Sequence, residues 1–160
     1  MTNQAFENVT EQELERLAHL LAPLAQPGDF IALEGELGAG KSVFARAFIR
    51  TIMGQNELDV PSPTYNLVQT YAPPAPLPEI WHVDLYRLEK PEDLIELGLE
   101  DAGRDAVLLV EWPDRLARQV PSDILKVAIT RGPNENLRHV ELTPGASWKD
   151  KIGKINLIRQ

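Results

Sequence analysis

Apolar positions near the N-terminus follow the spacing of a helix. They recur every three or four residues, at Leu14, Leu17, Ala18, Leu21 and Leu24. This spacing places them on one face of an amphipathic helix. Thr10 followed three residues later by Glu13 forms a capping box, so we expect the helix to begin just after Thr10. Pro27 and Gly28 end the helical pattern.

The pattern then changes to a short continuous apolar run. Phe30 to Leu33 has the length of a buried strand, and a glycine-rich segment follows it. After the glycines, apolar residues return at helical spacing, at Val43, Phe44, Ala47 and Phe48. The order predicted for this part of the chain is therefore strand, loop and helix.

Several later segments have the composition of strands. Leu67 to Tyr71 and Ile80 to Val83 are rich in β-branched and aromatic residues, and a proline-rich surface loop separates them. The run AVLLVEW, residues 106–112, is apolar without alternation, which is typical of a fully buried parallel strand. The segments ILKVAIT, 124–130, and LRHVELT, 137–143, alternate as half-exposed antiparallel strands do.

Between these strands the sequence predicts one more short helix. It is expected to open at Pro91 and to end at Gly98 as its C-cap. Its inward apolar residues are Leu94, Ile95 and Leu97. The alternation of strands and helices predicts an α/β fold with a mixed, mostly parallel sheet and helices on both faces. With 160 residues and 43% apolar content, we expect residues 1–160 to form a single domain.

Charge and composition exclude some classes of function. The formal net charge is −8, which argues against broad adhesion to nucleic acid or to an anionic membrane. The chain has no cysteine, so disulfides and thiolate metal sites are excluded, in keeping with a reducing compartment. We see neither a signal peptide nor an apolar run near 18 residues, and therefore expect a soluble, cytoplasmic protein without membrane contact.

The glycine-rich segment carries the strongest chemical signal. Gly35 to Ser42, GELGAGKS, fits G-x-x-x-x-G-K-[ST] between a buried strand and an amphipathic helix. Glycines let successive N–H groups face one phosphate-binding concavity, and the following helix adds the positive end of its dipole. Lys41 is placed to reach the β- and γ-phosphates, and the Ser42 hydroxyl to ligate Mg²⁺. A flexible turn with a solvent-facing lysine is the alternative, and the strand–loop–helix context disfavours it.

A phosphate-binding loop of this kind needs an acid at the end of a neighbouring strand. Asp84 ends IWHVD and Glu111 ends AVLLVE, so both are candidates for orienting Mg²⁺ or the attacking water. Either carboxylate alone is equally consistent with a strand end that faces water. Glu111 follows the more continuously apolar run, which predicts a central strand beside the strand of the glycine loop.

Other side chains give weaker signals. In VPSPTYNLV, Thr64 stands where nucleotide switches carry a threonine that senses the γ-phosphate, although an ordinary proline turn also fits. His82, between Trp81 and Val83, is interpreted as a packed strand residue rather than a base. Trp112 is expected near a bound nucleotide or as a packing aromatic. Four arginines are candidates for phosphate contacts, and none stands out by spacing: Arg87, Arg104, Arg115 and Arg131.

Taken together, five segments resemble one known family. GELGAGKS, PSPTYNLVQTY, HVDLYRL, DLIELGLED and LVEWPDR, in this order, resemble the bacterial TsaE (YjeE) family of small P-loop ATPases. The resemblance runs from about Asp29 to Arg115 and is weaker in the N-terminal helix. The glycine loop alone occurs in many proteins, whereas its combination with SPTY, DLYRL and VEWP is specific.

The resemblance implies a fold, an activity and partners. The fold is the three-layer P-loop NTPase fold, and the activity is ATP hydrolysis with Mg²⁺, weak without partners. Members of the family are needed for the threonylcarbamoyladenosine modification of tRNA. They associate with the two sugar-kinase-like subunits of the threonylcarbamoyl transferase complex, and reset or activate that complex rather than touch the tRNA directly.

The resemblance also assigns roles residue by residue. The nucleotide would be held by the glycine loop and its flanks: Glu36, Leu37, Gly38, Ala39, Gly40, Lys41, Ser42 and Val43. Ser42 and Glu111 would ligate Mg²⁺, Thr64 would be the switch threonine, and Asp84 would place metal or water. Lys41 would complete the catalytic set. Ser42 and Val43 stand where the family has threonines, and serine keeps the metal-binding hydroxyl.

Two other functions fit a phosphate-binding loop. A small-molecule kinase needs an acceptor pocket and a mobile lid with paired arginines, and we find no candidate lid in 160 residues. A GTP switch module usually carries Asn-Lys-x-Asp, and the sequence has no such tetrapeptide. The sequence therefore favours the ATPase over both alternatives.

Overall fold

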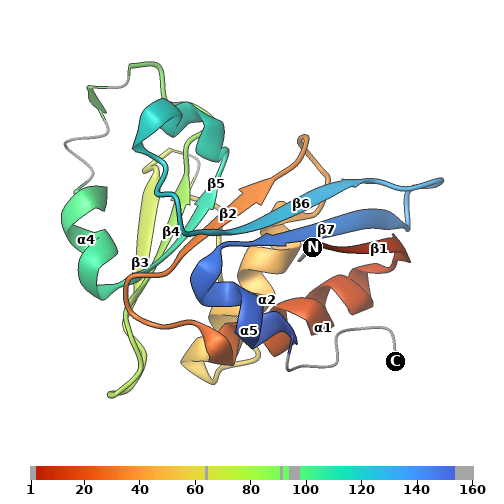
Figure 1. Cartoon of the computed structure of the whole chain (residues 1–160), viewed down its shortest axis with the longest axis horizontal. Coiled ribbons are helices and arrows are strands. Elements are labelled where there is room, and N and C mark those ends of the chain that lie inside the picture. The colour runs from red at the N-terminus through yellow and green to blue at the C-terminus, as the bar shows by residue number, and fades with distance from the viewer. Residues whose placement is uncertain (1–2, 64, 91, 94–97, 154–160) are drawn as a thin grey trace.

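The computed structural model describes residues 3–63, 65–90, 92–93 and 98–153 (Figure 1). Within this part of the chain seven strands form one sheet in the order β1-β7-β6-β2-β5-β4-β3. The strands are β1 (Gln4–Val9), β2 (Phe30–Glu34), β3 (Val68–Tyr71), β4 (Ile80–Asp84), β5 (Val107–Glu111), β6 (Leu125–Arg131) and β7 (Arg138–Pro144). The helices are α1 (Glu11–Leu21), α2 (Lys41–Met53), α4 (Leu99–Asp105) and α5 (Ala146–Gly153), with 3-10 turns η1 (Ala22–Leu24) and η2 (Pro113–Gln119).

The sheet is parallel in its middle and antiparallel at its edges. β2 pairs in parallel with β5 and β6, and β5 pairs in parallel with β4. The outer pairs β1–β7, β6–β7 and β3–β4 are antiparallel. The predicted mixed α/β sheet is confirmed, and its parallel character belongs to the four central strands. β5 lies directly beside β2, as the unbroken apolar sequence of residues 107–110 predicts.

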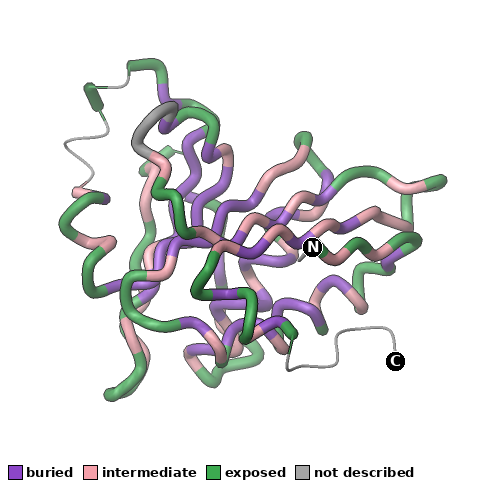
Figure 2. The backbone as a smooth tube through the Cα atoms, viewed as in Figure 1, coloured by how far each residue is buried: buried purple, intermediate pink, exposed green. Residues whose placement is uncertain are grey.

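Two apolar clusters cover the two faces of the sheet. On one face α1, α2 and α5 pack on alternate residues of the central strands, including Ile31, Leu33 and Leu109. On the other face α4 and η2 pack on the intervening residues, including Ala32, Leu108 and Val110. Figure 1 shows the helices divided between the two sides, and Figure 2 shows the buried central strands between them. Helices therefore cover both faces, as the alternation of elements predicts.

The N-terminal helix begins where its sequence predicts. The Thr10 side chain accepts a hydrogen bond from the Glu13 N–H (3.1 Å), and the Glu13 carboxylate accepts one from the Thr10 N–H (3.0 Å). This capping box satisfies two N–H groups that a helix end leaves without partners. β3 begins at Val68 rather than at Leu67, because Leu67 has a left-handed φ of +66°.

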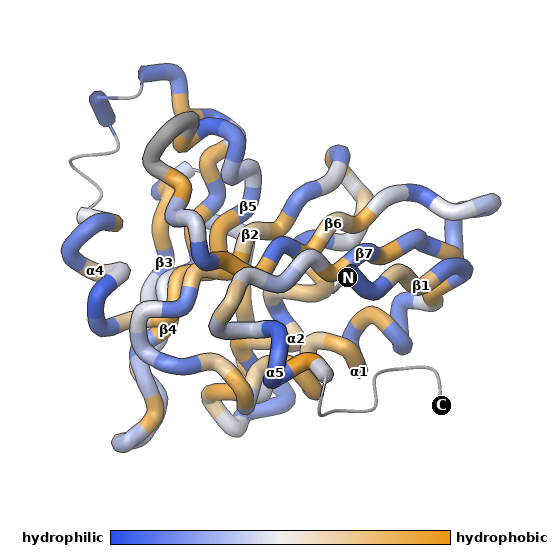
Figure 3. The backbone as a smooth tube through the Cα atoms, viewed as in Figure 1, coloured by the Kyte–Doolittle hydropathy of each residue, from blue (hydrophilic) through white to orange (hydrophobic). Residues whose placement is uncertain are grey.

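Three elements were not predicted. β1 pairs with β7 from the far end of the chain, and the register shifts between Phe6 and Val9. α5 has only eight residues. α4 is largely hydrophilic along its length (Figure 3), so its apolar signal is slight. Gly98, predicted as a C-cap, is the N-cap residue of α4 with a φ of +71°.

The predicted helix that opens at Pro91 cannot be compared with the structure, because Pro91, Leu94, Ile95 and Leu97 lie outside the described residues. Among the helices that are described, none combines the length and apolar character needed to cross a membrane.

Candidate functional site

The glycine loop is shaped by contacts that only glycine tolerates. Gly35 follows β2 with a φ of +151°, and a Cβ there would lie 2.3 Å from the Ile129 carbonyl oxygen of β6. Gly40 has a φ of +121° and is the N-cap residue of α2, and its Cβ would lie 2.9 Å from a Leu14 methyl group. A side chain at Gly35 would collide with the backbone of β6, whereas at Gly40 it would need the Leu14 side chain to move and would be strained by the positive φ. The loop thus enters α2 with its first N–H groups and the positive dipole end directed outward.

A cavity of about 480 Å³ lies at the start of α2. Residues of the loop, the neighbouring strand ends and the following turns line it: Leu37, Gly38, Gly40, Lys41, Ser42, Val43, Ser62, Asp84, Tyr86, Arg87, Glu111 and Trp112. The structure therefore brings together the lysine, the hydroxyl and both candidate acids that the sequence places far apart.

Lys41 is held inside the loop. Its side chain is only 5% exposed, and its ammonium donates hydrogen bonds to the Gly35 carbonyl and to the Glu36 carbonyl (2.9 Å). Burial lowers the pKa of the ammonium, and the negative charges of Glu111, Asp84 and Glu36 oppose this effect. The ammonium thus lies beside the cavity with backbone carbonyls as its hydrogen-bond acceptors.

Asp84 and Glu111 are neighbours at the ends of adjacent parallel strands. They are register partners in the β4–β5 pair, and both side chains are buried. Asp84 accepts hydrogen bonds from the Tyr86 N–H (3.0 Å) and from the Ser62 hydroxyl (3.0 Å). Two carboxylates so close to a buried ammonium make a site of opposed charges in a region of low dielectric.

His82 contacts the second of these acids. Its Nε2 lies 2.7 Å from Glu111 Oε2, and both side chains are buried. His82 is a packed strand residue, as the sequence indicates, but the contact with Glu111 was not predicted. Because side chains alternate along a strand, His82 and Asp84 share the face of β4 that α2 covers. This alternation, combined with the β4–β5 pairing, is the signal that would have identified the contact.

Two aromatic rings form one wall of the cavity. Trp112 follows Glu111 with a left-handed φ of +59°, and Pro113 begins η2 directly after it. The Trp112 ring centroid lies 4.3 Å from the Lys41 ammonium and 5.0 Å from the Tyr86 ring centroid. Trp112 is thus packed on an aromatic neighbour and lies near the glycine loop, while its expected place beside a bound nucleotide stays a prediction.

The other predicted loop residues are spread around this cavity. Glu36 and Leu37 line an adjoining hollow that shares the Tyr86 and Trp112 rings. Ala39 is buried within the loop, and Val43 lies between the main cavity and a smaller one of about 270 Å³. Thr64 falls outside the described residues, so its predicted switch role is not compared with the structure.

The four candidate arginines separate into two groups. Arg87 lines the cavity and lies 4.6 Å above the exposed Tyr65 ring, and Arg131 donates to the Leu37 carbonyl (3.2 Å). Arg104 and Arg115 do not line it. Arg138 was not considered from the sequence, yet its Nε donates to the Ala39 carbonyl (2.7 Å). The hydrogen bond from Arg138 to Ala39 depends on the pairing of β7 with β6, which no local sequence pattern predicts.

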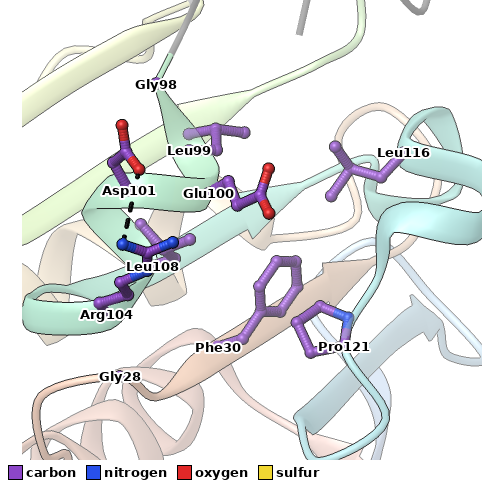
Figure 4. Close-up of a pocket in the computed structure, with 11 residues that line it drawn as sticks. Gly28, Phe30, Gly98, Leu99, Glu100, Asp101, Arg104, Leu108, Leu116 and Pro121 are labelled. Atoms are coloured by element: carbon purple, nitrogen blue, oxygen red, sulfur yellow. Dashed lines mark ion pairs between the residues drawn. The ribbon is translucent and has the colours of Figure 1, made fainter. Parts of the chain in front are cut away.

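A second large cavity lies on the opposite face of the sheet. It has a volume of about 540 Å³, and Figure 4 shows apolar side chains from β2, β5 and η2 around it. Charged side chains of α4 stand at its rim, where Asp101 and Arg104 form an exposed ion pair at 3.9 Å. Among the described residues considered for nucleotide or metal contact, only Arg104 lines this cavity.

The donor set at the glycine loop fits Mg²⁺ better than a softer metal. Ser42 is exposed to the cavity, and the carboxylates of Asp84 and Glu111 are hard oxygen ligands. Within the described residues no three His, Cys, Asp or Glu side chains are grouped so that they could hold a metal by themselves. A magnesium ion here would therefore need Ser42 and phosphate oxygens in addition to carboxylate.

The fold and the loop define a class of protein. A strand that leads through GELGAGKS into a helix, with an acid at the end of the adjacent parallel strand, is the arrangement of P-loop nucleotide-binding proteins. The family model described as "Threonylcarbamoyl adenosine biosynthesis protein TsaE" matches residues 8–140. The chain belongs to the TsaE family.

Individual relatives agree with this assignment. A TsaE protein of Rickettsia conorii is 41% identical over 118 residues, which is 74% of this chain and 66% of that protein. The match thus spans about two thirds of that relative's length. The Bacillus subtilis TsaE protein is 34% identical over 136 residues, 84% of this chain and 82% of that protein. The crystal structure of Bacillus subtilis YdiB superposes with a TM-score of 0.75 at 25% identity, covering 95% of this chain and 92% of that one.

Proposed function

We propose that the chain is an ATP-binding, Mg²⁺-dependent ATPase that serves the threonylcarbamoyladenosine modification of tRNA. One observation carries the proposal: the Lys41 ammonium, the Ser42 hydroxyl and the Asp84 and Glu111 carboxylates line one cavity at the start of α2. Membership of the TsaE family supplies the biological process. The whole chain, residues 1–160, acts as one ATPase domain in this proposal.

Each residue has a role in binding or positioning. The backbone of Gly38 to Ser42 holds the phosphates, and the flanking Glu36, Leu37 and Val43 shape the site. Lys41 exchanges its hydrogen bonds to loop carbonyls for bonds to the β- and γ-phosphates.

The two carboxylates, Glu111 and Asp84, have different roles. Ser42 and Glu111 hold Mg²⁺, which, when bound, neutralises charge on the transferring phosphoryl group. Asp84, fixed by its bonds from the Tyr86 N–H and the Ser62 hydroxyl, places the metal or the attacking water. Thr64 senses the γ-phosphate. Hydrolysis is weak without partners in this proposal, as the family resemblance implies.

The partners are the two sugar-kinase-like subunits of the threonylcarbamoyl transferase complex. The net charge of −8 suits a protein that contacts the complex and meets tRNA only indirectly. ATP hydrolysis resets or activates that complex between rounds of tRNA modification. The protein acts in the cytoplasm, together with the complex and the tRNA that the complex modifies.

Reconstitution tests the proposal. The purified chain is mixed with the transferase subunits, tRNA, Mg²⁺ and ATP, and modified adenosine is counted per complex over time. We expect repeated rounds with the unaltered chain and with an Arg104→Ala control, and a stop after about one round with Lys41→Ala or Glu111→Gln. Repeated rounds with the Lys41 variant, or a preference for GDP over ADP in competition binding, would contradict it.

A further inference from the structure

Two arginines of the β6–β7 pair bind the carbonyl groups of the P-loop. Arg131 and Arg138, named here the arginine pair, are register partners at the end of these antiparallel strands. Arg131 Nη2 donates to the Leu37 carbonyl (3.2 Å). Arg138 donates through Nε to the Ala39 carbonyl (2.7 Å) and through Nη2 to the Gly38 carbonyl (3.5 Å). Three consecutive carbonyls of the loop therefore accept from two guanidinium groups.

These carbonyls control the direction of the loop's donors. In a planar trans peptide, the carbonyl of one residue and the N–H of the next point in opposite directions. Bonds to the Leu37, Gly38 and Ala39 carbonyls thus turn the N–H groups of Gly38, Ala39 and Gly40 away from the arginine pair. The Ala39 N–H closes the loop on the Glu36 carbonyl (3.1 Å), while Gly38 and Gly40 line the cavity.

Arg138 is itself anchored in the hairpin that joins the strands. Its Nη1 donates to the Glu135 carbonyl (2.5 Å) and to the Leu137 carbonyl (3.1 Å). No carboxylate of the described residues lies within ion-pair distance of either guanidinium. Both charges therefore remain available to polarise the loop peptides, which makes the opposite N–H groups better donors to an anion.

We propose that the arginine pair fixes the P-loop backbone in its phosphate-binding shape before nucleotide arrives, so that the β6–β7 hairpin is part of the nucleotide site. This inference rests on the proposed function of the loop as a phosphate site. It assigns Arg131 a different task from the direct phosphate contact considered for it, because its guanidinium is bonded to the loop backbone. Both residues are positioning residues.

The test compares variants that keep the charge but lose the planar arrangement of donors. Arg138→Lys and Arg131→Lys are measured for ADP and ATP affinity by calorimetry with Mg²⁺ present. We expect about tenfold weaker binding for Arg138→Lys and about threefold for Arg131→Lys, from the loss of charge-assisted bonds to the loop. The loss must be equal for ADP and ATP, because the loop is altered rather than a γ-phosphate contact.

A matched control exists on the same helix that the loop enters. Arg50 Nε donates to the Leu58 carbonyl (2.8 Å), which is the same type of bond in the last turn of α2, about 14 Å from Lys41 by helix rise. Arg50→Lys removes one arginine–carbonyl bond outside the site. We expect unchanged nucleotide affinity in this variant.

A second measurement is independent of nucleotide binding. Amide hydrogen exchange of the nucleotide-free protein reports how firmly residues 36–42 are held, and thermal melting shows that each variant is folded. We expect faster exchange of this segment in both arginine-pair variants and not in Arg50→Lys. Unchanged exchange and affinity in Arg138→Lys would overturn the inference, as would a loss confined to ATP. If the unaltered protein binds no nucleotide, the proposed function fails while the exchange result still decides the inference.

Discussion

The two faces of the sheet differ in where they bury charge. The four buried polar or charged side chains of the described residues are Lys41, His82, Asp84 and Glu111, and all lie on the face that α2 covers. The opposite face has a cavity of similar size, about 540 Å³ against about 480 Å³ at the start of α2 and about 610 Å³ in the adjoining hollow, with an apolar floor and its charges at the exposed rim. Buried charge, rather than cavity size, therefore marks the functional face.

Physical chemistry explains why this distinction is informative. A buried charge costs free energy unless hydrogen bonds and opposite charges compensate it. Lys41 has two loop carbonyls, Asp84 has two donors and Glu111 has His82. A sheet face that only needed stability would use apolar residues, as the opposite face does. Variants of the buried charged residues on the α2 face should thus change function more than stability, and variants of apolar residues on the other face should do the reverse.

The largest expected effect is on turnover in a Glu111→Gln variant. The amide keeps the side-chain shape and a bond to His82, but it loses the charge that holds Mg²⁺ in the proposed mechanism. ATP hydrolysis is expected to fall by about a hundred- to a thousandfold, the range seen when one group stabilising a transition state is removed. ADP affinity without metal should change little.

Steady-state hydrolysis with the transferase subunits and metal-free ADP titration are the two measurements. Asp84→Asn is the comparison, because Asp84 lies beside Glu111 in register and has its own donors. Full activity of Glu111→Gln beside an inactive Asp84→Asn would reassign the metal ligand to Asp84.

The next effect is on binding in a Lys41→Met variant. Losing the ammonium removes its proposed contact with the phosphates, and we expect nucleotide affinity to fall by about a hundredfold, as for a charged hydrogen bond left unmade. The folded protein should be at least as stable as before, because methionine carries no charge to desolvate in this buried position. Calorimetry and chemical denaturation measure the two quantities. A variant that unfolds at lower denaturant would break the contrast between the faces.

A smaller effect distinguishes two adjacent leucines of β5. Leu109 is fully buried under α2, whereas Leu108 faces the other side and borders the cavity of about 540 Å³ there. Leu109→Ala should lower the free energy of unfolding by about 3 kcal/mol and Leu108→Ala by about 2 kcal/mol, because truncation costs less where space already exists. Equal losses would mean that the cavity beside Leu108 is filled in solution.

Nucleotide affinity tests whether the face that carries Leu108 also affects function. Leu108→Ala should bind ADP within about twofold of the unaltered protein, since surface and core changes away from a site rarely alter it more. A marked loss would connect the opposite face to the nucleotide site and end the division proposed above.

Local patterns were sufficient for the parts of the fold that carry their own signals. The capping box of α1, the strand–loop–helix around GELGAGKS and the unbroken apolar run of β5 were all predictable, because each depends on residues close in sequence. The adjacency of Glu111 to the loop strand followed from that apolar run.

The remaining features depend on pairing between distant segments. β1 is stabilised by β7, more than a hundred residues away, and QAFENV has no strong strand pattern of its own. The contact between His82 and Glu111 and the bonds from Arg138 to the loop require the register of β4–β5 and β6–β7. A single sequence gives no such register, so the side chains that support the site were harder to predict than those within the loop.

The smallest effect is on the pH dependence of stability. Burial lowers the pKa of Lys41 below its ordinary value of 10.5, so between the lowered pKa and 10.5 the unfolded chain binds more protons than the folded one. In that window the contribution of Lys41 to stability must rise with pH, and below it the full penalty of the buried ammonium applies. Lys41→Met removes this dependence.

The stability advantage of Lys41→Met should therefore be largest near neutral pH and should shrink as the pH approaches 10.5. Denaturation of both proteins at a series of alkaline pH values measures the difference. A constant difference would mean that the pKa of the Lys41 ammonium is the same in the folded protein as in water. In that case the carboxylates of Glu111, Asp84 and Glu36 would offset the whole cost of burial, and the α2 face would hold its charge without loss of stability.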